Sequence, residues 1–336
     1  MAGQGDIRMD EIILKAFGKV NLALDITGVR ADGYHEVRMI LENVGLYDTV
    51  RLRRLPAESP EAQTGPVRLQ MDPAGVTAGV PTDARNIAFR AAQLMQETYA
   101  IRDGVEITIT KRIPVAAGMA GGSTDAAAVL RGMNRLFDLG IPEEELMKTG
   151  LALGADVPFC VHGGTMLAEG IGEKLTAVPG IREMAPESAL VLVKPSEGAS
   201  TGAIYRGYDG MPEEAVDHPD LDRVTELLRT GAEEKLLDLF PEMKNVLEPV
   251  TRELVPVIPA IEEQLLAAGA EKAMMTGSGP TVFGIFRNRA AAERAAGILR
   301  AWDEERTGLA GTGKEVADQL LQILVTGWED LEGDDE

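Results

Sequence analysis

A glycine-rich segment holds the residues of this chain that are best suited to bind an anion. It runs from Pro114 to Ala127 and reads PVAAGMAGGSTDAA. An apolar strand is expected before it and an amphipathic helix after it. Small residues let the backbone approach a bulky anion, and the helix N-terminus presents unpaired N–H groups. The segment is therefore a candidate phosphate-binding loop, although a structural turn capped by Ser123, Thr124 or Asp125 explains the same residues.

Two charged residues, Lys19 and Asp156, stand among apolar neighbours. Lys19 lies inside the apolar stretch Lys15–Leu24, and Asp156 lies between Leu153 and Phe159. A buried charge costs free energy unless it has a partner of opposite sign. The two side chains are therefore candidates to face each other at a reactive site. The alternative is that each is a solvent-facing charge at the end of a strand.

A second glycine-rich stretch resembles a nucleotide-binding loop only in its spacing. Gly308–Lys314 has the G-x-x-x-x-G-K pattern, but the next residue is Glu315, where coordination of Mg²⁺ needs Ser or Thr. The residues before it, Ala291–Arg306, indicate a charged helix and not the strand that such a loop follows. We therefore interpret this stretch as a surface loop.

Composition narrows the classes of function that fit the chain. Its 336 residues suit two domains, and a hydrophobic share of 45% suffices for a sizeable core. The net charge of −21 disfavours nucleic acid and anionic membrane surfaces as partners, since both need clustered Lys and Arg. Small anions still fit, because a few cations and backbone N–H groups suffice to bind a triphosphate.

Cysteine usage and hydropathy indicate where the protein works. The one cysteine, Cys160, permits no internal disulfide and favours a reducing compartment. Residues Met1–Glu11 lack the apolar core of a signal peptide, and no apolar run reaches the length of about 18 residues that a membrane span needs. We expect a cytoplasmic monomer or weak homodimer with a small-molecule partner. The acidic end, Trp328–Glu336, should be a solvated tail.

Local patterns predict the elements that would position these residues. The apolar runs Ile12–Ile26 and Val37–Val44 flank Asp32-Gly33, which indicates a hairpin. Strands and helices mix without strict alternation, as in α+β folds. The other expected elements are a helix capped by Thr82 or Asp83, a strand over Val105–Thr110, a helix after the glycine-rich segment with Ala126, Val129, Leu130, Met133 and Phe137 on one face, a helix from Pro142 to Gly154, a strand over Ala189–Val193, a flexible connector over Tyr208–Arg223 and a helix over Ala260–Ala268.

Together with one more segment, these stretches resemble the GHMP kinases, a family named for galactokinase, homoserine kinase, mevalonate kinase and phosphomevalonate kinase. The glycine-rich segment is similar to that family's phosphate-binding motif, and Met274–Phe283 is similar to its C-terminal motif. The resemblance extends from about Leu14 to Val325. It implies an α+β fold with an ATP-binding domain over residues 1–163 and a substrate-side domain with an acidic tail over residues 164–336. The active site would lie in the cleft between them.

Four further segments resemble one branch of this family, whose acceptor is a sugar alcohol that carries cytidine diphosphate. They are Asp32–Glu36, Arg85-Asn86, Gly154–Phe159 and the stretch from Ser200 to Tyr205. The sequence departs mildly from the family pattern, with Phe17-Gly18 before the lysine, Met119 in place of Leu and Thr124 in place of Ser. Each change keeps the size class or the hydroxyl group.

The resemblance implies phosphoryl transfer from ATP to the 2-hydroxyl of a methylerythritol unit, in the non-mevalonate route to isoprenoid precursors. Asp156 would take the proton from that hydroxyl, and Lys19 would hold Asp156 and neutralise charge at the transferring group. Asn86 would lie near the adenine, and Mg²⁺ would arrive with ATP near Ser123. The residues that would bind ATP are Asn86, Pro114, Ala116, Ala117, Gly118, Met119, Ala120, Gly121, Gly122, Ser123 and Thr124.

The resemblance also implies a site for the cytidyl group. Tyr34 and Tyr205 would sandwich the cytosine ring, and His35 would read its hydrogen-bonding edge. The ordinary alternative is that both tyrosines are core residues with hydrogen-bonded hydroxyls. The residues that would contact or border the rest of this substrate are Asn21, Thr201, Gly277 and Ser278.

Two other functions fit parts of the pattern. A GHMP kinase acting on another small alcohol, such as mevalonate or homoserine, has no cytosine to read, so Asp32–Glu36 argues against it. A non-catalytic nucleotide-binding protein on the same scaffold needs the phosphate loop but not the base. Lys19 and Asp156 therefore argue against that second alternative.

Overall fold

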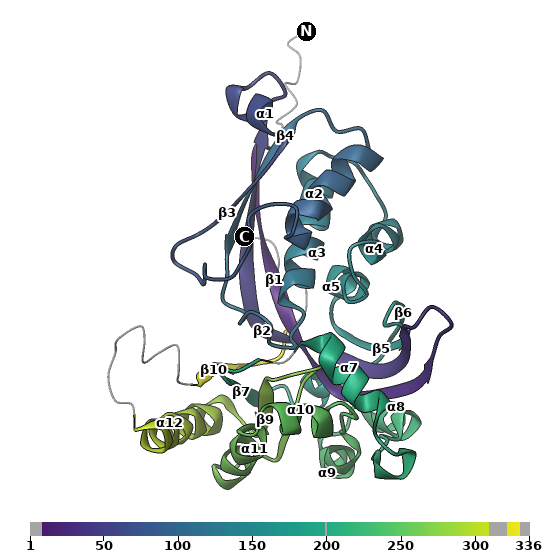
Figure 1. Cartoon of the computed structure of the whole chain (residues 1–336), viewed down its shortest axis with the longest axis vertical. Helices are drawn as coiled ribbons and strands as arrows, with labels where there is room; N and C mark the ends of the chain where they lie inside the picture. The colour runs from purple at the N-terminus through teal and green to yellow at the C-terminus, as the bar shows by residue number, and fades with distance from the viewer. Residues whose placement is uncertain (1–8, 199, 309–320, 330–336) are drawn as a thin grey trace.

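The computed structural model describes residues 9–198, 200–308 and 321–329, which form two sheets with helices packed against each (Figure 1). Within these residues the first sheet has the order β3-β4-β2-β5-β6, and β1 also pairs with β2. All neighbours are antiparallel except β3 and β4. The strands are β1 (Glu11–Val29), β2 (His35–Leu55), β3 (Val67–Met71), β4 (Gly104–Thr110), β5 (Thr165–Gly170) and β6 (Lys174–Ala177).

The β1–β2 hairpin spans both halves of the molecule (Figure 1). Val29 pairs with His35 across its turn, where Gly33 has a φ of +85°, a conformation that favours glycine. The predicted hairpin is thereby confirmed, but β2 continues past Val44 to Leu55. Because β2 is so long, it pairs with β5 near the turn and with β4 near its other end.

Helices cover one face of the first sheet (Figure 1). Of the predicted apolar face of α3, Ala126, Val129, Leu130 and Met133 are fully buried, which confirms that helix, whereas Phe137 is partly buried and forms its C-cap. The helix predicted from Pro142 to Gly154 is α4, which has Pro142 as its N-cap and ends earlier, at Leu151. The helices of this part are α1 (Pro60–Thr64), α2 (Ile87–Thr98), α3 (Gly121–Leu136), α4 (Glu143–Leu151) and α5 (Val157–His162).

The start of α2 differs from the prediction. Neither Thr82 nor Asp83 caps it; Asn86 does, since its Oδ1 accepts a hydrogen bond from the amide of Ala88 at 2.9 Å. Asp83 instead accepts hydrogen bonds from the amide and the guanidinium of Arg85, in the turn before the helix. Asp83, one of the two predicted caps, is therefore used to stabilise a local turn and not the helix end.

The second sheet has the order β10-β7-β9-β8, with every pair antiparallel. The strand predicted over Ala189–Val193 is β7, and the helix predicted over Ala260–Ala268 is α11, so the α+β class is confirmed. The strands are β7 (Ala189–Lys194), β8 (Lys272–Met275), β9 (Val282–Phe286) and β10 (Gln322–Thr326). The helices are α6 (Ile181–Met184), α7 (Thr201–Asp209), η1 (Glu213–Ala215), α8 (Leu221–Thr230), η2 (Glu233–Lys235), α9 (Leu236–Leu239), η3 (Phe240–Glu242), α10 (Glu248–Leu254), α11 (Ile258–Ala267) and α12 (Arg289–Thr307).

The connector predicted over Tyr208–Arg223 is wrong as a plain flexible loop. It contains the end of α7, all of η1 and the start of α8. Charge pairs with distant segments hold it in place: His218 Nδ1 lies 2.6 Å from a carboxylate oxygen of Asp25, and Lys244 Nζ lies 2.6 Å from one of Asp217. Such partners are far apart in sequence, so a local pattern does not reveal them.

Strand pairing bears on where the two domains meet. The division expected after residue 163 precedes β5 and β6, yet both strands pair within the first sheet. We propose a later division, between Ala177 and Ala189, on the basis of sheet membership. Isolated bridges join Leu24 to Asn245 and Val44 to Trp328, so residues of the two parts meet directly.

Within the described ranges, every helix is too short or too polar to cross a membrane. The acidic tail predicted after Trp328 lies almost entirely outside the described residues. So does most of the surface loop predicted over Gly308–Glu315.

Candidate active site

Two neighbouring cavities bring the predicted site residues together. The hairpin cavity, of about 430 Å³, is lined by residues of β1, β2, α7 and the turn after β8. The glycine cavity, of about 400 Å³, is lined by the glycine-rich segment and by residues around Asn86. Both cavities share four lining residues, namely Gly118, Ser123, Asp156 and Thr201. Ligands in the two cavities would therefore meet at these residues.

The glycine-rich segment folds as a loop with left-handed residues that leads into α3. Ala116, Gly118 and Ala120 have φ values of +53°, +72° and +58°. Ala120 is the N-cap of α3, and no side chain caps that helix end. The alternative of a structural turn capped by Ser123, Thr124 or Asp125 is therefore wrong. The first-turn N–H groups, with the positive end of the helix dipole, instead lie at the glycine cavity.

Most residues predicted to bind ATP line the glycine cavity, but Thr124 does not. Thr124 is buried, and its Oγ1 donates to the carbonyl oxygen of Gly121 at 2.9 Å, within the first turn of α3. The predicted residues that do line this cavity are Asn86, Pro114, Ala116, Ala117, Gly118, Met119, Ala120, Gly121, Gly122 and Ser123.

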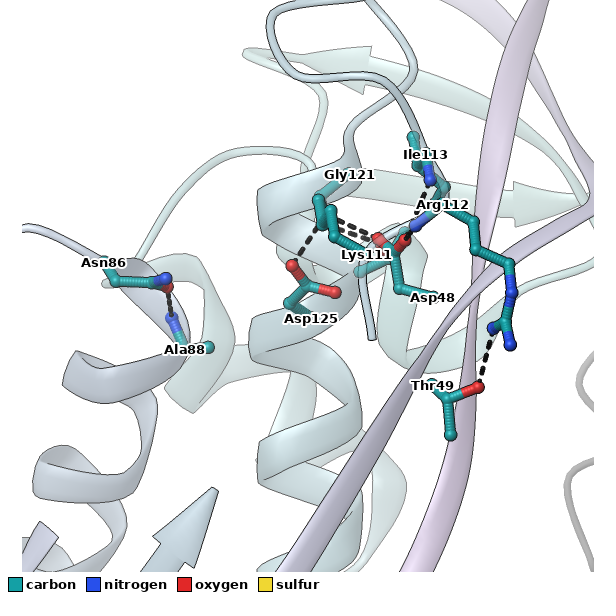
Figure 2. Close-up of polar contacts among 10 residues, drawn as sticks. Asp48, Thr49, Asn86, Ala88, Lys111, Arg112, Ile113, Gly121 and Asp125 are labelled. Carbon is teal, nitrogen blue, oxygen red and sulfur yellow. Dashed lines mark hydrogen bonds and ion pairs between the residues drawn. The ribbon is translucent and has the colours of Figure 1, made fainter. Parts of the chain in front are cut away.

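Asn86 lies at the rim of the glycine cavity with its side chain already engaged. Besides capping α2 through Oδ1 (Figure 2), it donates from Nδ2 to the carbonyl oxygen of Pro81 at 2.9 Å. Both polar atoms of the side chain thus fix the loop before α2. The residue shapes the cavity wall, and recognition of a base there would rest on its neighbours' backbone and apolar surface.

Close backbone contact explains two of the glycines. A Cβ on Gly118 would lie 2.5 Å from the carbonyl oxygen of Thr276, and one on Gly277 would lie 2.7 Å from the carbonyl oxygen of Gly118. Only glycine therefore lets the C-terminal turn pack against the loop. That turn brings Gly277 and Ser278 to the hairpin cavity, where Ser278 Oγ lies 3.0 Å from Thr201 Oγ1.

Lys19 is buried, and its ammonium group points at the loop. Nζ donates to the carbonyl oxygen of Gly118 and to Oδ1 of Asn21, both at 2.7 Å. Burial lowers the pKa of Lys19, and the negative charge of Asp156 opposes that lowering. No direct ion pair joins Lys19 to Asp156 among the described residues, so the two share a cavity wall without the contact expected between them.

Asp156 stands where the two cavities meet. It occupies the N-cap position of α5, but its side chain makes no capping hydrogen bond. Its half-buried carboxylate lines both cavities. A carboxylate in this position can accept a proton from a ligand in one cavity while facing a second ligand in the other.

Asn21 and Thr276 form a support for Lys19 that the sequence analysis did not foresee. Asn21 is 1% exposed, and its Oδ1 accepts from both Lys19 Nζ and Thr276 Oγ1, the latter at 3.2 Å. The amide of Asn21 in turn donates to Thr276 Oγ1 at 2.9 Å. The position of Thr276 in the C-terminal motif was the only clue to its role. Asn21, predicted to contact the substrate, lines the hairpin cavity and also holds Lys19.

The aromatic residues predicted for the cytidyl group all line the hairpin cavity. The rings of His35 and Tyr205 are 4.8 Å apart, and His35 Nε2 lies 2.7 Å from a carboxylate oxygen of Asp209. Burial, with a smaller effect from Asp156, raises the pKa of Tyr205 to about 12. Tyr34 is 63% exposed at the cavity mouth. Tyr34 is thus not a core residue, while Tyr205 has one side on the core and one on the cavity.

A buried charge cluster beneath the loop was also missed. Lys111 follows β4 and lies between Asp48 on β2 and Asp125 on α3 (Figure 2). Burial raises the pKa of Asp125 to about 8, against the effect of the Lys111 charge. Both Lys111 and Asp125 line the glycine cavity. Asp48 lies beyond the apolar run Val37–Val44 that predicted the strand, so the clue used for Lys19 did not single it out.

The fold and the loop define a GHMP kinase. Residues 86–164 match the GHMP kinases N terminal domain, and residues 214–304 match the GHMP kinases C terminal domain. More specifically, the chain belongs to the 4-diphosphocytidyl-2-C-methyl-D-erythritol kinase family, and it is an ATP-dependent kinase of a small molecule.

Relatives with that name cover nearly the whole chain. The protein from Acetivibrio thermocellus is 48% identical over 281 residues, which is 83% of this chain and 92% of that protein. The protein from Lachnospira eligens is 43% identical over 301 residues, or 89% and 96% of the two chains. A crystal structure of 4-(cytidine 5'-diphospho)-2C-methyl-D-erythritol kinase superposes with a TM-score of 0.69 at 28% identity, over 95% of this chain and 100% of that one. Homoserine kinase from Cytophaga hutchinsonii, at 18% identity and a TM-score of 0.68, shares the fold.

Proposed function

We propose that this kinase transfers the γ-phosphoryl group of ATP to the 2-hydroxyl of 4-diphosphocytidyl-2-C-methyl-D-erythritol, in the non-mevalonate route to isoprenoid precursors. The observation that supports this proposal most directly is that Asp156 lines both cavities. The acceptor oxygen would form a bond to the γ-phosphorus while the bond to the ADP oxygen breaks. Asp156 would take the hydroxyl proton, a contribution of about 10²–10⁴ in rate.

The glycine cavity supports the ATP side of this proposal. The uncapped N-terminus of α3 offers N–H groups and a positive dipole end to the triphosphate. Lys19 would stabilise charge on the transferring phosphoryl group, since its ammonium is held at Gly118 by Asn21. In this assignment Lys19 acts on the phosphoryl group and influences Asp156 only through their charges.

Mg²⁺ belongs to the proposal as a companion of ATP. Magnesium prefers oxygen ligands and keeps several waters and phosphate oxygens around it. The hydroxyl of Ser123, which lines both cavities, is a fitting protein ligand. Within the described part of the chain, no group of three or more His, Cys, Asp and Glu residues could hold a metal. When bound, the ion would offset charge on the β- and γ-phosphates.

The hairpin cavity supports the acceptor side. Tyr205 and His35 present adjoining rings to it, and Tyr34 stands at its mouth, so a cytosine ring has aromatic faces to stack on. The hydrogen bond between His35 and Asp209 fixes the imidazole orientation, which suits a group that reads one edge of a base. The hydroxyls of Thr201 and Ser278 would contact the sugar alcohol and diphosphate between the base and Asp156.

Purified protein incubated with ATP, Mg²⁺ and a panel of acceptors tests the proposal. ADP should form with 4-diphosphocytidyl-2-C-methyl-D-erythritol and not with mevalonate, phosphomevalonate or homoserine, and chelation of Mg²⁺ should stop the reaction. Formation of ADP with one of the other alcohols alone would assign the enzyme to that acceptor.

The proposal extends to the setting in which the enzyme works. A cytoplasmic location fits the free, buried thiol of Cys160. The net charge of −21 disfavours a nucleic-acid partner. We propose a monomer or weak homodimer, which sedimentation at several protein concentrations would test.

Replacement of Tyr205 by alanine should raise the KM for the cytidyl acceptor by about 5- to 150-fold, because base stacking contributes about 1–3 kcal/mol and 1.36 kcal/mol is tenfold. The KM for ATP should hardly change, and kcat should fall little, since stacking is made equally in the ground and transition states. A uridine diphosphate analogue should also be a poor acceptor of the wild-type enzyme. Steady-state kinetics with each substrate varied checks both points.

Tyr208→Ala is the matched control for this substitution. Tyr208 lies on the same helix and packs against the same core, but it does not line the hairpin cavity. It should lower the melting temperature without raising the acceptor KM. If Tyr205→Ala and Tyr208→Ala have the same KM for the cytidyl acceptor, Tyr205 is only a core residue and does not bind the base.

A further inference from the structure

The ammonium group of Lys111 joins three elements beneath the glycine loop. Lys111 is 4% exposed. Its Nζ donates to Oδ2 of Asp48 at 2.5 Å, to Oδ2 of Asp125 at 2.7 Å and to the carbonyl oxygen of Gly121 at 2.8 Å (Figure 2). These three acceptors use the full donor capacity of an ammonium group. The side chain therefore fixes the first residue of α3 relative to the first sheet.

Asp48 anchors this cluster in the sheet. The residue is fully buried on β2, and its Oδ1 accepts hydrogen bonds from the amides of Arg112 and Ile113 at 2.5 and 2.8 Å. Figure 2 shows these contacts beside those of Lys111. Asp48 thus holds the end of β4 with one oxygen and Lys111 with the other. The path from the sheet to the loop passes through buried and partly buried hydrogen bonds, and the low local dielectric strengthens them.

The contact with Gly121 determines where the next amide points. In a trans peptide the C=O and the N–H of the next residue lie in one plane and point in opposite directions. Because the carbonyl oxygen of Gly121 faces Lys111, the N–H of Gly122 faces the other way. Gly122 is exposed and lines the glycine cavity, so this amide is one of the donors available to a phosphate there.

The loop is held by a lysine near each end. Lys19 Nζ donates to the carbonyl oxygen of Gly118, and Lys111 Nζ donates to that of Gly121. Lys19 lies on β1 and Lys111 directly follows β4, and each is 4% exposed. Each fixes one peptide plane of the loop, which would otherwise depend on small residues with few contacts of their own.

We propose that Lys111, anchored by Asp48 and Asp125, is a positioning residue that sets the geometry of the phosphate-binding loop from behind. Although Lys111 lines the glycine cavity, all three donors of its ammonium group are used by Asp48, Asp125 and Gly121, so it acts through the Gly121 peptide. The inference rests on the proposed function, in which this loop binds the phosphates of ATP. A cluster that served only to hold the fold together would have no need to bind the loop carbonyl.

The double variant Lys111→Met with Asp125→Leu tests this inference. It removes the ammonium group together with one of the two carboxyl groups that accept from it, since removal of the lysine alone would leave both buried groups without that donor. The KM for ATP should rise by about tenfold or more, because a shift of about 1 Å in a binding group can cost 10²-fold. The KM for the cytidyl acceptor should stay within about twofold. Hydrogen exchange at Gly122 and Ser123 should also accelerate, whereas exchange in β4 should not.

A second, partly buried charge cluster supplies the control. Arg252 on α10 pairs with Glu248 and with Glu262 on α11, and none of the three lines either cavity. The double variant Arg252→Met with Glu262→Leu should lower the melting temperature without changing the KM for ATP. If the Lys111 double variant behaves like this control, Lys111 contributes to stability alone and the proposal is overturned.

Two further measurements keep the outcome decisive. Should the double variant not fold, Lys111→Arg keeps the charge but replaces a compact ammonium by a planar fork that cannot take the same three acceptors. This variant should raise the KM for ATP by about threefold or more, and a wild-type value would overturn the proposal. Calorimetric titration with ADP separates the two hypotheses. If the wild-type protein fails to bind ADP, the proposed function is wrong, whereas equal binding by wild type and variant refutes only the role of Lys111.

Discussion

Replacement of Asp156 by asparagine is expected to lower kcat with the cytidyl acceptor by about 10²–10⁴-fold, the usual contribution of a general base. Asparagine has nearly the same shape but cannot take a proton. Because Asp156 makes no capping hydrogen bond, the melting temperature should be nearly unchanged. The dissociation constant for ATP should also stay within about threefold, since the loss concerns the transition state. Single-turnover kinetics and calorimetry measure these quantities.

Asp238→Asn is a suitable control for this substitution. Asp238 is half exposed on α9, where it pairs with Lys235, and it lines neither of the two cavities. Its replacement should leave kcat unchanged. A kcat of Asp156→Asn close to that of this control would show that another group accepts the proton.

The fold could be predicted wherever local pattern and tertiary packing agree. The β1–β2 hairpin follows from two apolar runs around Asp32-Gly33, and α3 follows from its one-sided apolar face. The prediction ended this strand at Val44, the last residue of the apolar run, whereas β2 continues through Asp48 to Leu55. Asp48 belongs to the strand because Lys111 and two backbone amides satisfy its carboxylate. Those partners come from about 60 residues further along the chain, beyond any local pattern.

The sequence predicted which residues lie at the candidate site but not which atoms they contact. Residue types and the family resemblance placed Lys19, Asp156 and the glycine-rich segment together, and the structure brings them to adjoining cavities. The partners of Lys19 could not be foreseen, because opposite charge suggested Asp156 while the ammonium group binds two neutral oxygens. Charge alone indicates that a buried lysine needs acceptors. The backbone determines which acceptors are within reach.

Asn86 and Thr124 illustrate the same limit at the glycine cavity. Both have polar side chains next to a candidate anion site, so the resemblance assigned them to the ligand. In the structure Asn86 caps α2, and Thr124 bonds back to Gly121 within its own helix. Ser, Thr and Asn readily satisfy local backbone groups, and that competition is decided by rotamer and packing.

Replacement of Gly122 by valine is expected to raise the KM for ATP by about 100-fold, with little change in melting temperature. A Cβ at this position meets only Ile87, at ordinary contact distances of 3.5 and 3.7 Å, so the fold has room for it. The residue is exposed in the first turn of α3, where valine is a better helix former than glycine. The branched side chain would occupy the space through which the phosphates approach the N–H groups. A misplacement of about 1 Å is enough for a loss of that size.

Gly297→Val is the matched control, because Gly297 also lies in a helix, α12, and a Cβ there meets nothing within 4 Å. Both variants gain the same side chain at a helical position, so they should share any change in melting temperature. The increase in KM for ATP should belong to Gly122→Val alone, and titration with ADP should show the same difference in affinity. If Gly122→Val unfolds the protein without a selective loss of nucleotide binding, the glycine is needed for the turn itself. The loop would then be a structural feature, and the triphosphate would have to bind elsewhere.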